Sequence, residues 1–296
     1  MAAFDSIEQA RALQFRANVI HLYQQKGSKL RDRTRVEPLL GKAHFFERLS
    51  SEAAVVKSSR HADTVLLDPV HSRRMVVPLD YVWNALTDQQ DKVRTLINPE
   101  SEYAIAAANA LQRAYDVAVI TAFAADAKGG EDGSTAVTFA SDQAGDADPS
   151  AGAVDTGDVL NAQKALDNNE VPDDDRYALV RPSFVSQLLA NSTAPIAASS
   201  DYNSVKALVM GELNTWVGFT WIKSTLLPLA AGTDYYNFFW QKNAMGVAIN
   251  KDIMARVSER PDKDYSVQAY ACLTMGATRV QGTGVYRIRH DDGIAI

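Results

Sequence analysis

The sequence predicts an α+β fold, and three features of the chain indicate it. An alanine-rich segment, residues 99–127, has the composition of one long helix. Over residues 158–240, segments with helical periodicity alternate with short apolar segments that are typical of strands. Residues 267–275 place apolar and polar side chains alternately, which is the pattern of a strand with one face buried.

The helix predicted over residues 99–127 has the clearest start signal in the chain. Asn98 is a favourable N-cap, Pro99 suits the first helical position, and Glu100 complements the positive end of the helix dipole. Eleven of the 29 residues in this segment are alanine, the best helix former. At 1.5 Å per residue the helix would be about 43 Å long, which exceeds the width of a small globular domain. Gly129 is expected to stop it.

Before this helix, the chain predicts one helix and then extended structure. Apolar residues recur at helical spacing over residues 5–25, which indicates an amphipathic helix. Basic residues then occupy every second position over residues 29–35, a pattern that suits an extended arm with one basic edge. Residues 37–78 contain short apolar runs separated by proline, which favours a long β-hairpin or excursion.

After the long helix, short elements follow one another. Residues 126–158 are rich in Gly, Asp, Ser and Ala, with one strand-like core at residues 136–139. A Gly-Ala pair is expected to end the strand of residues 267–275, and a second extended stretch covers residues 286–289. Between these regions the pattern predicts helices over residues 159–166, 182–189 and 205–210, and strands over residues 177–180, 216–222 and 236–240.

The charge of the chain is divided unevenly along its length. Residues 1–94 hold 15 Lys and Arg against 11 Asp and Glu, whereas residues 95–296 hold 15 against 25. The two parts therefore carry +4 and −10, within a total of −6. This asymmetry suggests either that the basic part of one copy contacts the acidic part of another, or that a basic segment faces a polyanion. Chance scatter of surface charge is the simpler alternative.

Composition and motifs exclude several classes of protein. A single cysteine, Cys272, rules out an intrachain disulfide and a cysteine-based zinc cluster. The first residues lack the pattern of a signal peptide, and no apolar window approaches the length of a membrane span. The phosphate-binding, dinucleotide-binding, nucleophile-elbow and zincin motifs are absent, and Gly282-Thr283-Gly284 lacks the third glycine of a dinucleotide loop.

Some residues still invite a functional interpretation. His61, Asp63, Asp68 and His71 are types that bind metals, but their spacing does not present them together, so loop charges are the better interpretation. The second cluster of such residues, His290-Asp291-Asp292, is better explained as a frayed polar tail. Cys272 falls within a strand and is better explained as a small packed residue than as a nucleophile. The aromatic run over residues 235–240 lacks interleaved basic residues, which favours core or subunit interface over base stacking.

The order of these parts resembles the major capsid proteins of tailed bacteriophages, which have the Hong Kong 97-like fold. The resemblance covers most of the chain and rests on an ordered set of segments, because these proteins have no catalytic signature. The segments are VPLDYVWNALTDQQDKVRTLINPESEYAIAAANALQRAYDVAVITAF, RYALVRPSFVSQLL, QKNAMGVAINKDIMARVSERPDKDY and GATRVQGTGVYRI.

The resemblance implies a division of the chain into the parts of that fold. The long helix over residues 99–127 would be the spine helix of a peripheral domain, and the closing strands would bridge two domains mechanically. The implied parts are an N-terminal arm (residues 1–36), an extended loop (37–78), the peripheral domain (79–155), an α/β axial domain (156–274) and a closing strand that returns to the peripheral domain (275–296).

The resemblance also implies a function. The chain would self-assemble, as hexamers and pentamers, into an icosahedral shell around the double-stranded DNA genome of a tailed phage, without catalysis, cofactor, metal or membrane. Expected partners are a separate scaffolding protein, a portal protein and a decoration protein, and the expected location is the virion, after the host cytoplasm. The alternatives are a nanocompartment shell protein that encloses a cargo enzyme and, with less support, a metal-dependent enzyme.

Charged residues are the candidate functional residues, because a shell protein has no catalytic site. The basic candidates would face DNA or a neighbouring subunit, and the sequence does not choose between these two. The acidic candidates form either a solvated turn or an acidic surface for a basic neighbour. The basic set is Lys29, Arg31, Arg33, Arg35, Arg73 and Arg74, and the acidic set is Asp173, Asp174 and Asp175.

Overall fold

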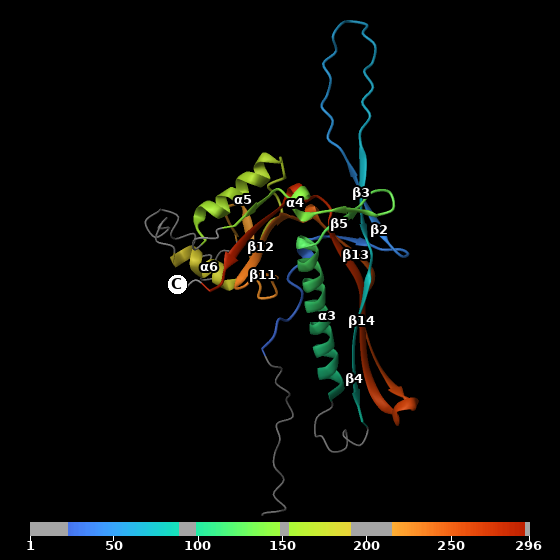
Figure 1. Ribbon diagram of the computed structural model, residues 1–296. Helices are drawn as coiled ribbons and strands as arrows, with labels where there is room; N and C mark the ends of the chain where they lie inside the picture. Colours follow the sequence, from blue (N-terminus) through green and yellow to red (C-terminus); the bar gives the residue numbers. More distant parts are fainter. Residues whose placement is uncertain (1–22, 89–98, 149–153, 191–214, 294–296) are drawn as a thin grey trace, which may run out of the picture. The chain divides into compact units, whose positions relative to one another are not determined.

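The computed structural model describes residues 23–88, 99–148, 154–190 and 215–293, and Figure 1 draws the other residues in grey. The described chain forms two compact units. The first is built from described residues within Met1–Gly27, Tyr81–Arg113 and Ile253–Leu273. The second is built from those within Ser28–Asp80, Ala114–Asp252 and Thr274–Ile296.

The first unit contains the beginning of the long helix α3 (Pro99–Ala124). Ala107 and Leu111 of this helix are buried, and their spacing of four residues places them on one face. Strand β4 (Leu79–Thr87) contributes Trp83, whose ring centroid lies 6.5 Å from that of Tyr103 on α3. This aromatic contact holds the strand to the helix within the unit.

Two long strands, β13 (Met245–Arg260) and β14 (Ser266–Arg279), follow one another through the short 3-10 turn η4 (Pro261–Lys263). They are the inner strands of a four-stranded sheet with the order β1–β13–β14–β4, and β1 (Arg35–Pro38) is parallel to β13. The extended structure predicted over residues 267–275 is confirmed by β14. The expectation that only one face is buried is wrong, because Gln268 and Cys272 of the other face are buried as well. The predicted apolar face is buried at Val267, Ala269, Ala271, Leu273 and Met275.

The predicted end of this strand at Gly276 is wrong, because β14 continues to Arg279. A side-chain carbon added at Gly276 would lie 2.7 Å from the backbone oxygen of Val77. The glycine therefore allows two backbones to approach closely and does not end the strand. The second closing strand, β15 (Val285–Asp291), includes the residues predicted to be extended.

The second unit contains a seven-stranded mixed sheet. Six strands follow the order β7–β15–β12–β8–β10–β9, and β11 pairs with β12. Strands β8 (Arg176–Val180) and β10 (Phe219–Lys223) are parallel, whereas β12 (Asp234–Gln241) is antiparallel to both β8 and β15. The remaining strands are β7 (Gly145–Ala147), β9 (Thr215–Trp216) and β11 (Leu229–Ala231).

Helices α5 (Thr156–Asn168) and α6 (Pro182–Ala190) pack against one face of this sheet. Helix α5 begins with a capping box, in which the side chains of Asp155 and Asp158 each accept a hydrogen bond from the other's backbone N–H. Its buried residues are spaced for one helical face. They join a core cluster that includes Val159, Ala162, Leu166, Phe184, Ala178, Val180, Phe219, Phe239 and Ile288.

The last turns of α3 pack against the opposite face of the same sheet. The ring of Phe123 lies 4.9 Å from that of Phe238 and 4.9 Å from that of Trp240. Phe239, between them on β12, points to the other face because successive strand residues alternate. The aromatic run predicted as core or interface is therefore core at these three positions, each fully buried.

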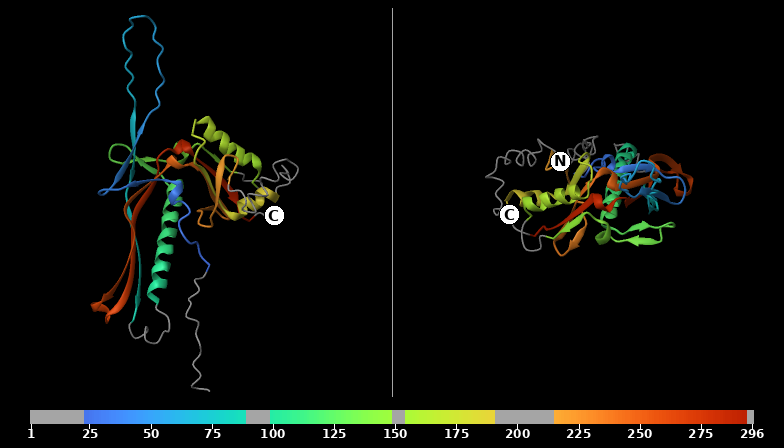
Figure 2. Two further views of the ribbon diagram at one scale, coloured as in Figure 1. Left: turned by 180° about the vertical axis from the view of Figure 1, so that it is seen from behind. Right: turned by 90° about the horizontal axis from the view of Figure 1, so that it is seen from above.

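A third sheet in the second unit has the order β2–β3–β5–β6. Residues 50–70 connect β2 (His44–Leu49) to β3 (His71–Val76) and extend as a long loop in the side views of Figure 1 and Figure 2. A hairpin is therefore confirmed within the segment predicted to contain one. The remaining elements near this sheet are β5 (Ala127–Gly129), β6 (Thr135–Val137) and α4 (Phe139–Asp142), and the other 3-10 turns are η1 (Arg31–Arg33), η3 (Lys242–Ala244) and η5 (Gly282–Gly284).

The predicted helices over residues 159–166 and 182–189 are confirmed by α5 and α6, whereas residues 23–25, the described end of the helix predicted over residues 5–25, are not helical. Helix α3 begins at Pro99 as predicted but ends at Ala124, because residues 127–129 enter the third sheet as β5. The predicted helix over residues 205–210 and the N-cap Asn98 lie outside the described residues, as does nearly all of the predicted helix over residues 5–25. No helix within the described ranges is long and apolar enough to cross a membrane.

Candidate functional site

Two of the predicted basic residues, Arg31 and Arg35, bind carboxylates of the same chain. Arg31 donates to Oδ2 of Asp252 at 2.5 Å, and this hydrogen bond raises the pKa of Arg31. Arg35 donates to Oε1 of Glu37 at 2.7 Å. Both pairs are partly exposed, so each contributes at most about 1 kcal/mol to folding. Their charges are therefore largely balanced but still accessible.

Lys29 and Arg33 bind backbone oxygens in the second unit. The Lys29 ammonium donates to the carbonyl oxygen of Lys223 at 2.6 Å, and the Arg33 guanidinium donates to the carbonyl of Lys29. The Trp240 indole donates to the Arg33 carbonyl at 3.1 Å, and the Arg33 guanidinium lies 5.9 Å from the Tyr177 ring. These contacts attach the basic segment to strands β8, β10 and β12. The segment is not extended throughout as predicted, because Arg31–Arg33 form the 3-10 turn η1.

Arg73 and Arg74 are neighbours in sequence but have opposite environments. Arg73 lies on the exposed side of the hairpin, 3.0 Å from Glu47 and 5.3 Å from the ring of Phe45. Arg74 is 7% exposed and donates to Oδ1 of Asp142 at 2.9 Å, while its Nε is buried without a hydrogen-bond partner in the described part of the chain. Alternation along β3 explains the difference.

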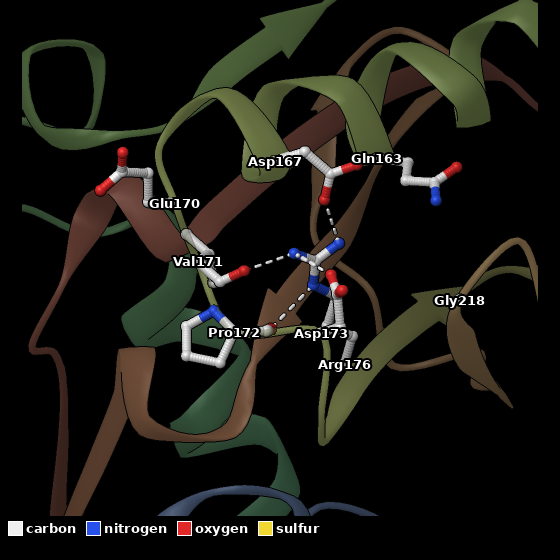
Figure 3. Close-up of a pocket in the computed structure, with 8 residues that line it drawn as sticks. All are labelled: Gln163, Asp167, Glu170, Val171, Pro172, Asp173, Arg176 and Gly218. Carbon is white, nitrogen blue, oxygen red and sulfur yellow. Dashed lines mark hydrogen bonds and ion pairs between the residues drawn. The ribbon is translucent and has the colours of Figure 1, made fainter.

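The acidic turn is built around a buried arginine, Arg176 (Figure 3). Its guanidinium binds Asp167 at 2.6 Å and Asp173 at 2.9 Å, and it donates to the carbonyl oxygens of Val171 and Pro172. The Asp173 side chain is 92% exposed despite this pair. A cavity of about 560 Å³ adjoins these residues, and its other lining residues are Gln163, Glu170 and Gly218.

Asp174 and Asp175 accept hydrogen bonds that connect the same turn to neighbouring strands. The Asp174 carbonyl accepts a bond from the Gln241 side chain at 3.5 Å. Asp175 has a φ of 53°, and its side chain accepts a bond from the Tyr177 hydroxyl at 3.3 Å. Tyr177 therefore lies between this turn and Arg33. Within the described residues, none of the predicted basic residues forms an ion pair with the three predicted aspartates.

Arg279, which the sequence pattern did not single out, connects several elements of the second unit. Its Nη1 donates to the carbonyl oxygens of Phe123 at 2.9 Å and Ala125 at 3.0 Å, at the end of α3. Its Nε donates to Oδ2 of Asp142 at 3.1 Å, and burial lowers the pKa of Arg279. One arginine at the end of a strand gives no sequence signal for this role.

His290 is 1% exposed within β15 and belongs to a buried polar cluster, so the predicted frayed polar tail at His290-Asp291-Asp292 is wrong at His290. His290 Nε2 lies 3.0 Å from the hydroxyl oxygen of Ser183, and its Nδ1 lies 2.7 Å from Nδ2 of Asn237. Because an amide nitrogen only donates, Nδ1 accepts, and Nε2–H donates to the serine. Burial lowers the pKa of His290. With an amide in place of a carboxylate at Nδ1, the pair lacks the orienting acid of a catalytic triad.

The alternative metal site receives no support from the geometry. No three His, Cys, Asp or Glu side chains within the described ranges lie close enough to hold a metal ion. His61, Asp63, Asp68 and His71 are all described, so the structure does not bring them together. Cys272 is buried in β14, as expected for a packed residue.

The loop of residues 50–70 leaves apolar side chains in solvent. Val56 is 89% exposed and Leu66 is 91% exposed. Soluble proteins rarely leave a group of such side chains uncovered unless they contact a partner. The other exposed large apolar side chains of this loop are Val55, Val65, Leu67 and Val70.

Comparison with known proteins shows which family and which solved structures this chain is similar to. A family model described as phage capsid protein matches residues 7–292. The solved capsid of Ralstonia phage GP4 has a TM-score of 0.72 at 10% identity, with 95% of each chain covered. The capsid of cyanophage P-SCSP1u has a TM-score of 0.70 at 16% identity, with 95% of this chain and 93% of that chain covered.

A third solved structure, the cyanophage Pam1 capsid, matches over 100% of both chains with a TM-score of 0.70 at 11% identity. At such identities, these likenesses establish the fold. A search of curated protein sequences gives no match.

Proposed function

This chain belongs to the phage capsid protein family, and from that premise we propose how its described parts build a shell. Its role is that of a major capsid protein, which is structural and not enzymatic, and which forms the virion capsid by self-assembly. The proposal is that copies assemble as hexamers and pentamers into an icosahedral shell that encloses double-stranded DNA.

The exposed loop of residues 50–70 is the observation that carries this proposal. A folded subunit gains nothing from Val56 and Leu66 at about nine-tenths exposure. Burying a side chain of this size contributes about 1.5–3 kcal/mol. The loop would therefore cover a neighbouring subunit, where these side chains leave water. Many weak contacts of this kind, repeated over a shell, make the assembly collectively stable.

We propose that the charged candidates also act in the assembled shell, by contact with DNA or with a neighbouring subunit. Arg31 and Arg35 are accessible, so they would meet either packaged DNA or an acidic surface of a neighbour, with partial release of their present partners. The exposed carboxylate of Asp173 would supply one such surface. Lys29, Arg33 and Arg73 have partners that are weaker or neutral, and they belong to the same proposal.

The parts implied by the resemblance remain proposals for this chain. They are an arm over residues 1–36, an extended loop over residues 37–78, a peripheral domain over residues 79–155, an axial domain over residues 156–274 and a closing strand over residues 275–296. A separate scaffolding protein, a portal protein and a decoration protein are the proposed partners, and assembly would begin in the host cytoplasm.

The loop proposal is tested by replacing Val56 and Leu66 together by Ser. The subunit should keep its free energy of unfolding, because these side chains make no buried contact in the subunit, whereas shell formation should fall sharply. The matched control is Leu160→Ser, since Leu160 is also exposed, on α5. Normal shells from the double variant, seen by electron microscopy, would refute the role of the loop.

The contents of purified particles separate the two shell functions. A phage capsid encloses nucleic acid, whereas a nanocompartment encloses a cargo protein. The ratio of absorbance at 260 nm to that at 280 nm, followed by nuclease and protease treatment, distinguishes them. Particles that hold a single cargo protein and no nucleic acid would contradict the proposed contents while leaving self-assembly intact.

A further inference from the structure

We infer that Arg48 and Arg74 form an oxyanion-binding site that a carboxylate of a second copy of this chain fills in the assembled shell. The inference rests on the proposed shell function and adds to it one defined contact between copies. It is carried by unbalanced charge and by unused hydrogen-bond donors on one face of the β2–β3 hairpin.

The pairing of the two strands brings the two arginines together. Arg48 is opposite Ser72, and Arg74 is opposite Phe46. Arg48 and Arg74 are therefore diagonal neighbours on one face of the hairpin, within reach of each other's long side chains. Phe46 and Arg74 are buried and Arg48 is half-buried, so Arg48 occupies the outer end of this face, where the loop of residues 50–70 begins.

Positive charge exceeds negative charge on this face. Arg74 binds Oδ1 of Asp142 at 2.9 Å, and Arg279 binds Oδ2 of the same carboxylate at 3.1 Å. Arg48 interacts electrostatically with Arg74 and Asp142. Its pKa is lowered mainly by burial and, to a smaller extent, by the charge of Arg74. Two guanidinium groups thus bind one carboxylate, Asp126 also acts on Arg279 through its charge, and Arg48 has no carboxylate bound to it. On the opposite face, by contrast, Arg73 has a partner of its own, Glu47, at 3.0 Å.

Several donors on this face have no acceptor. Within the described residues, the side chain of Arg48 makes no hydrogen bond or ion pair, although a guanidinium has five N–H donors. Arg74 Nε is buried without a partner. The hydroxyl of Ser72, opposite Arg48, is exposed and also makes no bond in the described chain. Two guanidinium groups and a hydroxyl match an oxyanion, which guanidinium binds through paired N–H groups.

A carboxylate from a second copy fits this site better than a DNA phosphate does. Each copy carries 36 acidic residues against 30 basic ones, so the surface of a neighbouring copy offers exposed carboxylates. Asp173, with a side chain 92% exposed, is an example. A half-buried site also suits a side chain that projects from a protein surface, whereas a basic surface that tracks a DNA backbone is open and continuous.

The test compares Arg48→Gln with Arg256→Gln in the full-length chain. Arg256 is exposed on β13 and makes no hydrogen bond or ion pair in the described residues, so it controls for the loss of one charge. Thermal unfolding of unassembled subunits is measured in sodium sulfate and in sodium chloride at equal ionic strength. Assembly is measured as the subunit concentration at which shells form.

The site predicts a specific combination of results. In chloride, Arg48→Gln should be at least as stable as the unchanged protein, because repulsion between Arg48 and Arg74 is removed. Sulfate should raise the unfolding temperature of the unchanged protein and of Arg256→Gln by equal amounts. The rise should be smaller for Arg48→Gln, in which only the general stabilising effect of sulfate on folded proteins remains. The concentration required for assembly should rise about tenfold or more for Arg48→Gln, as expected from the loss of one charge-assisted contact.

Other results would overturn the inference. Lower stability of Arg48→Gln in chloride would assign the residue to the fold of the subunit. Sulfate stabilisation of this variant equal to that of the unchanged protein would rule out the site, and normal assembly would rule out a second copy as the source of the anion. Normal shells with reduced DNA would identify DNA phosphate as the anion. Failure of the unchanged protein to assemble, both alone and with a co-expressed scaffolding protein, would count against the proposed function, whereas the sulfate comparison would still test the site.

Discussion

Replacing the buried Arg279 by Ala should destabilise the subunit more than the replacement of any exposed charged residue. The side chain is 0% exposed and binds two carbonyl oxygens at the end of α3 as well as Asp142. Its positive charge also complements the negative end of the helix dipole. Removal therefore affects the helix end, the buried carboxylate and the strand β14 at once.

The size of this effect can be worked out from the contacts. Removal of one partner of a buried ion pair costs about 3–5 kcal/mol. Asp142 keeps its bond to Arg74, which reduces this term. The buried carbonyl oxygen of Phe123 loses its donor, and an unsatisfied buried group costs about 1–3 kcal/mol, whereas water can replace the donor at the exposed Ala125. The expected loss in free energy of unfolding is therefore about 4 kcal/mol. Arg279→Lys keeps the positive charge but loses the planar guanidinium that binds several acceptors at once, and it should cost about 2 kcal/mol.

Urea unfolding of the unassembled subunit, followed by far-UV circular dichroism, measures this loss. Arg256→Ala is the matched control, because an exposed residue without partners should change stability by no more than about 0.5 kcal/mol. The order expected is Arg279→Ala below Arg279→Lys below Arg256→Ala. A loss below about 1 kcal/mol for Arg279→Ala would refute the argument that this residue anchors the end of α3.

Three further predictions concern the fold. Gly282→Ala should destabilise the subunit by about 3 kcal/mol, since a side-chain carbon there would overlap the backbone oxygen of Asp142; unchanged urea unfolding would contradict this packing. Ala107→Pro should cost about 3 kcal/mol or more, because it removes a hydrogen bond within α3; a variant with the stability and helical signal of the unchanged chain would contradict the helix. For His290, burial lowers the pKa below the ordinary 6.5, so the unfolded state binds the proton first and stability falls as pH drops below about 6.5. The slope attributable to this residue is at most about 1.4 kcal/mol per pH unit, and it stops at the folded-state pKa. His290→Gln should flatten the profile between pH 7 and pH 5; equal slopes would refute this assignment.

The parts of the fold that local chemistry specifies could be predicted from the sequence. Pro99 defined the start of α3, the alanine content predicted its length to within three residues, and Pro182 defined the start of α6. Alternation of apolar residues defined β14. In each case the signal lies within one segment, so no information about distant residues is required.

Glycine positions show where such reasoning fails. A glycine usually weakens a strand, and the pair Gly276-Ala277 therefore predicted an end. The actual reason for Gly276 is the backbone of Val77, 199 residues earlier in the chain, which only the folded structure brings close. Gly282 likewise makes room for the backbone of Asp142. Neither neighbour has a local signal.

The sequence indicated which charged residues are candidates, but it could not predict how buried each one is or which groups it contacts. Arg73 and Arg74 are adjacent and chemically identical, yet one is exposed and one is buried, which depends on the side of the strand that faces the sheet interior. Arg48 and Arg279 gave no signal, and His290 was assigned wrongly to a frayed tail, because the role of each depends on contacts with residues far away in the chain. The roles of the basic segment and the acidic turn stay predictions, to be tested in assembled particles.

The most direct test of the central claim is negative-stain electron microscopy of the purified full-length protein, with light scattering to measure mass. The protein should be examined alone and after co-expression with a scaffolding protein. Closed icosahedral shells, or rings of the size of capsomers, are the predicted result. A monomer of 32.3 kDa under every condition would contradict the account that this chain is a self-assembling capsid subunit.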